Sequence, residues 1–194
     1  MVRKDPRRTQ ERIRKNKELY EREDWEWFSE PEQQGVGCVI GKNVKFGKGV
    51  KVGNYSIIQD NCKIDNGTEI KDFVLIKEDT VIGENSYMDS YSISSGQNYI
   101  GNNVVIRYQT MIARGVTVED DCYLCAGVKT VYVDHRREQV EGIVIGEGCF
   151  VGDDVKIMSG VKVAPGTVLG AGCIVTKDIT EKGTYVGMPA RRLK

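Results

Sequence analysis

The chain has 194 residues, with 28 Lys and Arg balanced by 28 Asp and Glu, so its formal net charge at pH 7 is zero. This length allows one domain with a sizeable core, and the charge balance excludes a global attraction to nucleic acid or to an anionic membrane. Because no apolar run approaches the roughly 20 residues of a membrane-spanning helix and no signal-peptide core is present, we expect a soluble cytoplasmic protein without membrane insertion.

Residues 1–34 form a charged segment that we expect to be a helical extension. Basic residues dominate its first half and acidic residues its second half. Ile13, Tyr20 and Trp27 recur every seven residues, which predicts a helix with one narrow apolar stripe. Such a helix would cap the open end of the following domain or pack on a neighbouring subunit. A basic arm that binds membrane or nucleic acid is the alternative, and the balanced charge of the segment disfavours it.

Residues 35–194 form the second predicted unit, in which an apolar residue recurs at every sixth position. The first block runs through Ile40, Phe46, Val52, Ile58, Ile64, Ile70, Ile76, Ile82, Met88, Ile100, Ile106, Ile112, Val118 and Leu124, and the second through Ile145, Val151, Ile157, Val163, Leu169 and Val175. Only Ser94 and Thr130 interrupt the first block with polar residues. A spacing of six fits no face of a helix with about 3.6 residues per turn, and frequent glycines break any long strand. Short strands and corners, wound as an all-β solenoid with the apolar residues inward, satisfy the pattern.

The cysteines follow the same repeat. Small residues occupy the slot two positions before the apolar residue, and five of the six cysteines stand in it: Cys38, Cys62, Cys122, Cys149 and Cys173. The C-x-x-C pair of Cys122 and Cys125 resembles a redox or zinc motif. We interpret these residues instead as small buried hydrophobes in a reducing compartment, and we expect no metal site.

The repeat fails between Thr130 and Ile145, whose separation is not a multiple of six, so a loop should protrude at about residues 131–144. A loop on a rigid scaffold is a usual place for chemistry. This loop contains His135, the only histidine of the chain, beside Asp134. Beyond the loop, the coils should end after Val175, followed by a C-terminal cap.

The sequence IGEGCFVGDDVKIMSGVKVAPGTVLGAGCIVTKDI, followed by VGMPARRLK, resembles the hexapeptide-repeat acetyltransferases, and specifically the sugar O-acetyltransferase branch with the galactoside, maltose and streptogramin enzymes. The resemblance implies a left-handed parallel β-helix with triangular coils. It also implies that His135 is the catalytic base, that acetyl-CoA is the acyl donor and that a sugar hydroxyl is the acceptor. A neutral imidazole suits this role because its pKa lies near 6.5, and Asp134, Glu138 or a main-chain carbonyl would orient the ring.

The same resemblance implies a homotrimer with active sites between subunits and a binding surface for coenzyme A. The residues carried over by motif are Phe150, Gly152, Asp153, Ser159, Gly170, Ala171, Thr176, Lys177, Arg191 and Lys194. Phe150 would form the wall beside the histidine, where many relatives have Trp, and the cations would face the phosphates. The glycines and alanine serve equally well as coil corners, and C-terminal cations are often simply solvated.

Three other functions compete with sugar O-acetylation. A carbonic anhydrase of the same fold needs three histidine ligands per metal site, which one histidine per chain does not supply. N-acetylation of a nucleotide-linked amino sugar would use the same base. A non-catalytic solenoid scaffold is the alternative from another class, because fold does not imply function.

Overall fold

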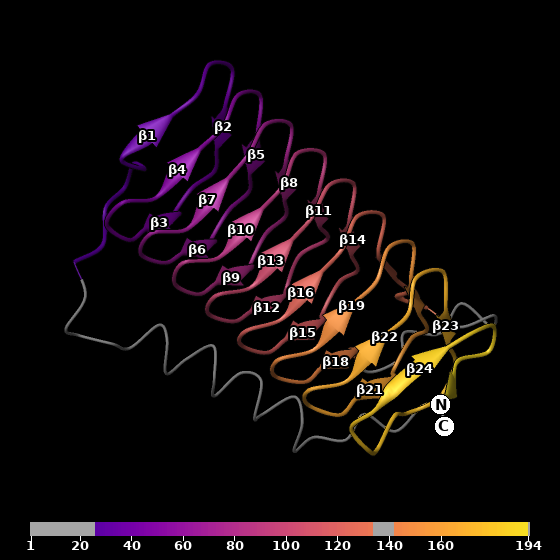
Figure 1. Ribbon diagram of the computed structural model, residues 1–194. Coiled ribbons are helices and arrows are strands. Elements are labelled where there is room, and N and C mark those ends of the chain that lie inside the picture. The colour runs from indigo at the N-terminus through magenta and orange to yellow at the C-terminus, as the bar shows by residue number, and fades with distance from the viewer. Residues whose placement is uncertain (1–25, 134–141, 194) are drawn as a thin grey trace, which may run out of the picture.

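The computed structural model describes residues 26–133 and 142–193, in which every helix or strand element is a short β-strand (Figure 1). The strands of these residues stack into three sheets around one core, and each coil from β1 to β21 contributes one strand to each sheet. This is the all-β solenoid that the six-residue pattern predicts, and it agrees with the left-handed parallel β-helix of hexapeptide repeats that the resemblance implies. The helix expected over residues 1–34 lies mainly outside the described residues.

The three sheets are named here by their first strands. The β1 sheet contains β1 (Gln33–Gln34), β4 (Lys51–Val52), β7 (Glu69–Ile70), β10 (Tyr87–Met88), β13 (Val105–Ile106), β16 (Tyr123–Leu124), β19 (Phe150–Val151), β22 (Val168–Leu169), β24 (Thr184–Val186) and β25 (Arg191–Arg192). The β2 sheet contains β2 (Val39–Ile40), β5 (Ile57–Ile58), β8 (Leu75–Ile76), β11 (Ile93–Ser94), β14 (Met111–Ile112), β17 (Lys129–Thr130), β20 (Lys156–Ile157) and β23 (Ile174–Val175). The β3 sheet contains β3 (Lys45–Phe46), β6 (Lys63–Ile64), β9 (Val81–Ile82), β12 (Tyr99–Ile100), β15 (Thr117–Val118), β18 (Val144–Ile145) and β21 (Lys162–Val163).

Successive coils stack in parallel register, and the six-residue spacing is the direct cause. In a typical two-residue strand such as β5, the second residue, Ile58, points inward and is fully buried, whereas the first, Ile57, points outward. The corners turn sharply because residues such as Asn61 adopt left-handed backbone angles (φ 59°). Glycine often follows the apolar residue because the next coil lies so close: a Cβ on Gly47 would stand 2.5 Å from the backbone nitrogen of Asn66.

The polar exception Ser94 belongs to a hydrogen-bonded network inside the coil. Its hydroxyl accepts from Asn98 Nδ2 at 2.8 Å and lies 3.0 Å from the hydroxyl of Thr80. Asn98 Oδ1 accepts in turn from the backbone N–H of Val116 at 2.9 Å. Ser94, Asn98 and Thr80 have no exposed surface, so these bonds offset the cost of burying polar groups in an otherwise apolar core.

Both ends of the solenoid are closed by local pairing. Phe28 and Phe46 exchange two backbone hydrogen bonds of 2.7 and 2.9 Å, which add an antiparallel bridge to the first strand of the β3 sheet. At the other end, β24 and β25 form an antiparallel pair on the β1 sheet. The inward pattern extends beyond the predicted end at Val175, because Ile179 is 6% exposed and bridges Val163. No helix long and apolar enough to span a membrane occurs in the described part of the chain.

Candidate functional site

The loop is an insertion that shifts the stacking register. Before it, each residue pairs with the one three hexads further along the chain, as Tyr99 does with Thr117. Across the loop this spacing is longer, because Thr117 pairs with Val144. The insertion lies between β17 and β18, as the sequence predicts, and its start is tied to the coil: Val131 N–H donates to the Ile157 carbonyl at 2.9 Å.

The predicted catalytic residues belong to this insertion. His135 and Asp134 fall on residues 134–141 and so lie outside the described residues. The structure therefore shows the residues that flank this segment, Val133 and Gly142, and the corner of the solenoid between β17 and β18 at which it is inserted.

The predicted coenzyme residues divide between two corners of the prism. The β1/β2 corner is the turn after each strand of the β1 sheet, and it holds Gly152, Asp153, Gly170 and Ala171. The β2/β3 corner is the turn after each strand of the β2 sheet, and it holds Ser159, Thr176 and Lys177 together with the loop. The two groups therefore lie on opposite edges of the β2 sheet, with β20 and β23 between them.

At the β1/β2 corner the coils are in close contact. Gly152 N–H donates to the Leu169 carbonyl at 2.8 Å, and Gly172 N–H donates to the Asp153 carbonyl at 2.7 Å. A Cβ on Gly152 would stand 2.7 Å from the backbone nitrogen of Ala171. Gly152 is therefore required by coil stacking itself, while Asp153 and Ala171 are exposed.

At the β2/β3 corner, Ser159 and Lys177 lie one above the other. Their strands β20 and β23 pair Ile157 with Val175, so these two residues occupy the same position on successive coils. Thr176 and Lys177 are exposed and Ser159 is half-buried. This edge, which also bears the loop, offers two hydroxyls and a cation to a bound molecule.

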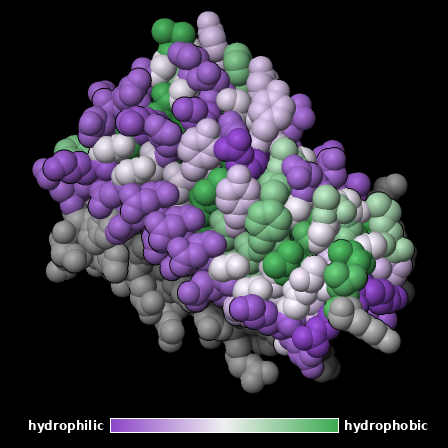
Figure 2. Space-filling view, in the orientation of Figure 1, coloured by the Kyte–Doolittle hydropathy of each residue, from purple (hydrophilic) through white to green (hydrophobic). Residues whose placement is uncertain are grey.

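Phe150 packs against an aromatic residue that is not among the predicted site residues. Its ring stacks on Tyr123 with centroids 5.7 Å apart and planes inclined by 11°. The two residues are register partners across the insertion, and counting hexads on both sides of the loop could have revealed the pair in the sequence. They belong to an apolar area over the C-terminal strands of the β1 sheet, with Val168 and Val186 (Figure 2).

Arg191 lies in β25 at the end of the β1 sheet, and its Nη1 donates to the Ala190 carbonyl at 3.0 Å. Its exposed side chain is separated by β22 and β24 from Phe150 in β19. Lys194 lies outside the described residues. A single chain thus brings Gly152 close to Ala171 and Ser159 close to Lys177. The residues beside Arg191 contact the end of the β1/β2 corner, since Ala190 N–H donates to the Ile174 carbonyl at 2.8 Å.

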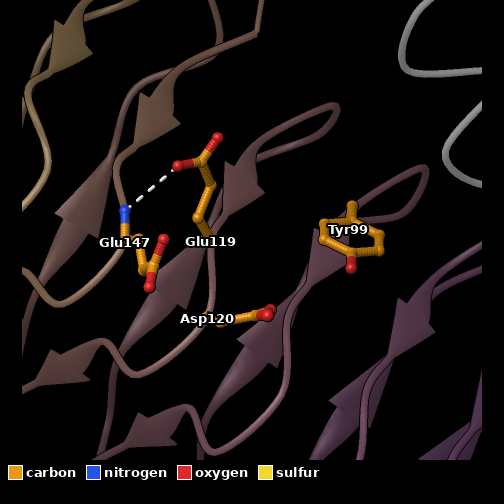
Figure 3. Close-up of a pocket in the computed structure, with 4 residues that line it drawn as sticks. All are labelled: Tyr99, Glu119, Asp120 and Glu147. Atoms are coloured by element: carbon orange, nitrogen blue, oxygen red, sulfur yellow. Dashed lines mark hydrogen bonds between the residues drawn. The ribbon is translucent and has the colours of Figure 1, made fainter.

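A small cavity of about 160 Å³ lies at the third corner, between the β3 and β1 sheets (Figure 3). It is lined by Tyr99, Glu119, Asp120 and Glu147. The carboxylates there support the corner backbone: Glu119 Oε2 accepts from Glu147 N–H at 3.1 Å, and Asp120 Oδ1 accepts from Asn102 N–H at 2.9 Å. No predicted site residue lines this cavity.

The cysteine slots are buried as predicted. Cys62, Cys122, Cys149 and Cys173 are at most 1% exposed, and Cys38 is half-buried. The Cys122 thiol donates to the Gly146 carbonyl at 3.1 Å, and burial raises the pKa of Cys62 to about 12. Within the described residues, no group of three or more His, Cys, Asp or Glu is arranged to hold a metal ion.

Two family models match the chain. The first, described as the GMPPB C-terminal domain, matches residues 35–132, and the second, described as the bacterial transferase hexapeptide with six repeats, matches residues 142–177. The two matches lie on either side of the loop.

The chain also resembles individual proteins. It is 32% identical over 95 residues to a serine acetyltransferase of Buchnera aphidicola subsp. Acyrthosiphon pisum (strain APS), covering 48% of this chain and 35% of that protein. It is 32% identical over 98 residues to C18B11.09c of Schizosaccharomyces pombe (strain 972), a protein provisionally named an acetyltransferase, covering 49% of this chain and 42% of that protein. The chain therefore spans less than half the length of these relatives.

Among solved structures, LpxA from Acinetobacter baumannii has the same fold, with a TM-score of 0.56, 20% sequence identity, and coverage of 82% of this chain and 73% of that chain. Because the GMPPB C-terminal domain model matches half of the sequence, and the hexapeptide model continues beyond it, the chain belongs to the family described as the GMPPB C-terminal domain and carries bacterial transferase hexapeptide repeats.

Proposed function

We propose that the protein is an acyl-CoA-dependent transferase that acetylates a hydroxyl of a sugar or glycan precursor, with His135 as the general base. The register change at the loop is the observation that carries this proposal. It assigns the segment with the only histidine of the chain to the β2/β3 corner, on the same edge as Ser159, Thr176 and Lys177. The acetyltransferase names of both relatives support the same class of reaction.

The chemistry needs few groups from the protein. Acetyl-CoA is already activated as a thioester, so the enzyme has to remove the proton of the acceptor hydroxyl as its oxygen attacks the carbonyl. Imidazole Nε2 or Nδ1 would take that proton, and the coenzyme thiol would leave and receive a proton in turn. Asp134 would fix the ring tautomer. Both substrates meet in one complex, so no covalent acyl-enzyme is required.

The coenzyme would lie along the C-terminal coils. Its phosphates would face Lys177, Arg191 and Lys194, and its chain would pass the backbone of Gly152, Asp153, Gly170 and Ala171. Phe150, fixed against Tyr123, would form an apolar wall near the reacting thioester.

A homotrimer would complete the site, since one chain leaves the two corners on opposite edges of the β2 sheet. The outward face of the β2 sheet supports self-association, because it carries five apolar residues in successive coils: Val39, Ile57, Leu75, Ile93 and Met111. The adjoining corner adds four aromatic residues that are 43–55% exposed: Tyr55, Phe73, Tyr91 and Tyr108. Together they expose apolar area on the order of 500 Å², a large share of the roughly 800 Å² that each partner buries in a stable interface.

The test is release of coenzyme A thiol from acetyl-CoA in the presence of a panel of sugar acceptors. We expect His135→Ala to lower turnover by about 100- to 10,000-fold, while its melting temperature and molar mass in solution match those of the wild-type chain. Asp134→Asn should reduce turnover less. Turnover of His135→Ala within about threefold of the wild type would exclude the histidine as the base.

Two other functions make different predictions. An N-acetyltransferase acting on a nucleotide-linked amino sugar would release thiol only with an amine acceptor. A non-catalytic solenoid is the alternative from another class, because fold does not imply function. It predicts no rise in melting temperature with acetyl-CoA, whereas a ligand at a hundredfold excess over its Kd stabilises the folded chain by about 2.7 kcal/mol.

A further inference from the structure

The outward face of the β2 sheet changes from apolar to cationic at one coil. Its outward residue is apolar in every coil from Val39 to Met111. The next two outward residues are Lys129 and Lys156, both exposed, and they are followed by Ile174. The change occurs where the loop leaves the coil, directly after the strand that contains Lys129.

The neighbouring β1/β2 corner changes at the same level. On the N-terminal side its turns carry Tyr55, Phe73 and Tyr91, whose rings stack with centroids 5.4 and 5.0 Å apart, and Tyr108 closes the row. In the next coil the corner residues are Ala126 and Gly127. Bulky aromatic side chains are therefore replaced by small ones beside Lys129. The corner of the following coil carries the exposed carboxylates of Asp153 and Asp154, and Asp154 lies over Gly127.

Lys129 and Lys156 are direct register partners in adjacent parallel strands, whose spacing is about 4.8 Å. Like charges facing each other across strands are unfavourable. Other strand lysines have a compensating neighbour. Lys63, the register partner of Lys45, has the Trp27 ring 5.0 Å from its Nζ, and Lys51 faces the opposite charge of Glu69 with Nζ and Oε1 3.3 Å apart. Within residues 26–133 and 142–193, no carboxylate forms an ion pair with Lys129 or Lys156.

We propose that Lys129 and Lys156 form an anion-binding site that takes a phosphate or pyrophosphate group. Two ammonium groups at adjacent register positions match the charge of one phosphate and can contact different oxygens of it. The phosphate has two possible sources, the coenzyme or a nucleotide-linked acceptor, and the choice between them rests on the proposed transferase function. The site itself does not, because a phosphate compound would bind to these lysines in a non-catalytic solenoid as well.

The site lies between the two groups of predicted coenzyme residues. Lys156 starts β20, with Gly152 and Asp153 on the preceding corner and Ser159 on the following one. Lys129 stands one coil earlier, in the strand from which the loop departs. A ligand that reaches from these corners toward the loop would thus pass over the two lysines.

The experiment measures binding of three probes, coenzyme A, uridine diphosphate and inorganic pyrophosphate, by calorimetry at low salt. Wild type is compared with Lys129→Gln, Lys156→Gln and the double variant. Lys162→Gln is the matched control, because Lys162 is an outward lysine at the start of β21 in the β3 sheet, in the same coil as Lys156. Melting temperatures verify that each variant folds.

We expect each single substitution to weaken binding of at least one probe by about three- to tenfold, the double variant by more, and Lys162→Gln by less than twofold. Raising the salt concentration should weaken wild-type binding and reduce the difference between wild type and the double variant. Selective loss of coenzyme A binding would identify the coenzyme phosphates as the ligand. Loss of uridine diphosphate binding would identify a nucleotide-linked acceptor.

Three results would overturn the site. One is that the wild-type chain binds none of the probes at millimolar concentration. Another is that the double variant binds them as the control does. The third is that the double variant melts several degrees lower with unchanged affinities, which would mean that acidic residues of the chain itself occupy the lysines. Binding of uridine diphosphate or pyrophosphate without coenzyme A would instead contradict the transferase proposal and leave the anion site intact.

Discussion

The side-chain hydroxyl of Thr130 accepts the backbone N–H of Ala113 at 2.6 Å, at a place where the regular ladder uses a main-chain carbonyl. One coil earlier, for example, Ser95 N–H donates to the Ile112 carbonyl at 2.8 Å. The hydroxyl of Thr130 therefore replaces the main-chain carbonyl as the acceptor at the point where the chain leaves the coil and enters the loop. This hydrogen bond explains why residue 130 is polar although the equivalent residue of most other coils is apolar. The residue at which the chain leaves the coil for the loop is therefore itself part of the buried core.

Removing this hydroxyl should destabilise the fold at the loop exit. Thr130→Val keeps the shape but leaves the buried N–H of Ala113 without an acceptor, so we expect a loss of about 1–3 kcal/mol in the free energy of unfolding. Thr130→Ser retains the hydroxyl and should lose less. Urea denaturation of the three chains measures the difference, and equal stability of the valine variant and the wild type would contradict the assigned role.

Lys63 should make stability rise with pH in the alkaline range. Burial, and secondly Lys45, lower the pKa of Lys63 from 10.5 to about 8, against the opposing effect of Asp65. Between these two values the unfolded chain binds more protons than the folded chain, so the free energy of unfolding increases as the pH rises from 8 to 10.5. The full difference is at most about 3 kcal/mol.

Lys63→Met tests this effect, because methionine fills similar space without a charge. We expect the variant to be more stable than wild type near neutral pH and to lose that advantage near the pKa of an unfolded lysine, as measured by urea denaturation at both values. A stability difference between the variant and wild type that is the same at both pH values would show that folding does not lower the pKa of Lys63.

Arg114 should stabilise the fold through Glu78, two coils away. Their side chains form an ion pair across Gly96, which has a left-handed backbone (φ 97°) and where a Cβ would stand 3.3 Å from Arg114 Nη2. The hydrogen bond from Arg114 lowers the pKa of Glu78 below its ordinary value. The stabilisation is therefore complete above the unfolded pKa of about 4.3 and disappears as the pH falls through the lower folded value.

Arg114→Met should consequently be less stable than wild type at neutral pH, with the difference shrinking as the pH falls below the unfolded pKa. Glu78→Gln should show the same pH dependence, and the double variant should be no worse than either single variant. Denaturation midpoints from neutral to acidic pH give the measurement. A difference between wild type and Arg114→Met that stays constant over this range would exclude the carboxylate of Glu78 as the partner that matters.

The Tyr123–Phe150 pair should couple in stability and in coenzyme binding. Stacked rings contribute about 0.5–1.5 kcal/mol beyond their burial, so a double-mutant cycle with alanine should give a coupling energy of that size. On the proposed function, Phe150→Ala should weaken acetyl-CoA binding by about tenfold, Tyr123→Ala less, and Phe150→Trp little. Unchanged affinity in Phe150→Ala would remove this residue from the coenzyme site.

The sequence by itself determined that the chain winds as a β-solenoid. Its six-residue apolar spacing allows neither a helix nor a long strand, so the inward residues, the cysteine slots and the position of the loop were all predictable from local pattern. The coenzyme residues were predictable only as motif positions, because a motif does not show on which side of a corner each residue lies.

Only the tertiary structure decided how coils align, and this alignment creates the contacts that matter for function. Tyr123 meets Phe150 and Lys129 meets Lys156 because the loop lengthens the separation between register partners by the same amount at both pairs. Arg114 reaches Glu78 because two coils are stacked across a glycine. The two residues of such a pair are far apart in the sequence, and their side chains point outward. The six-residue apolar pattern fixes only the inward residues, so it does not predict which outward residues face each other.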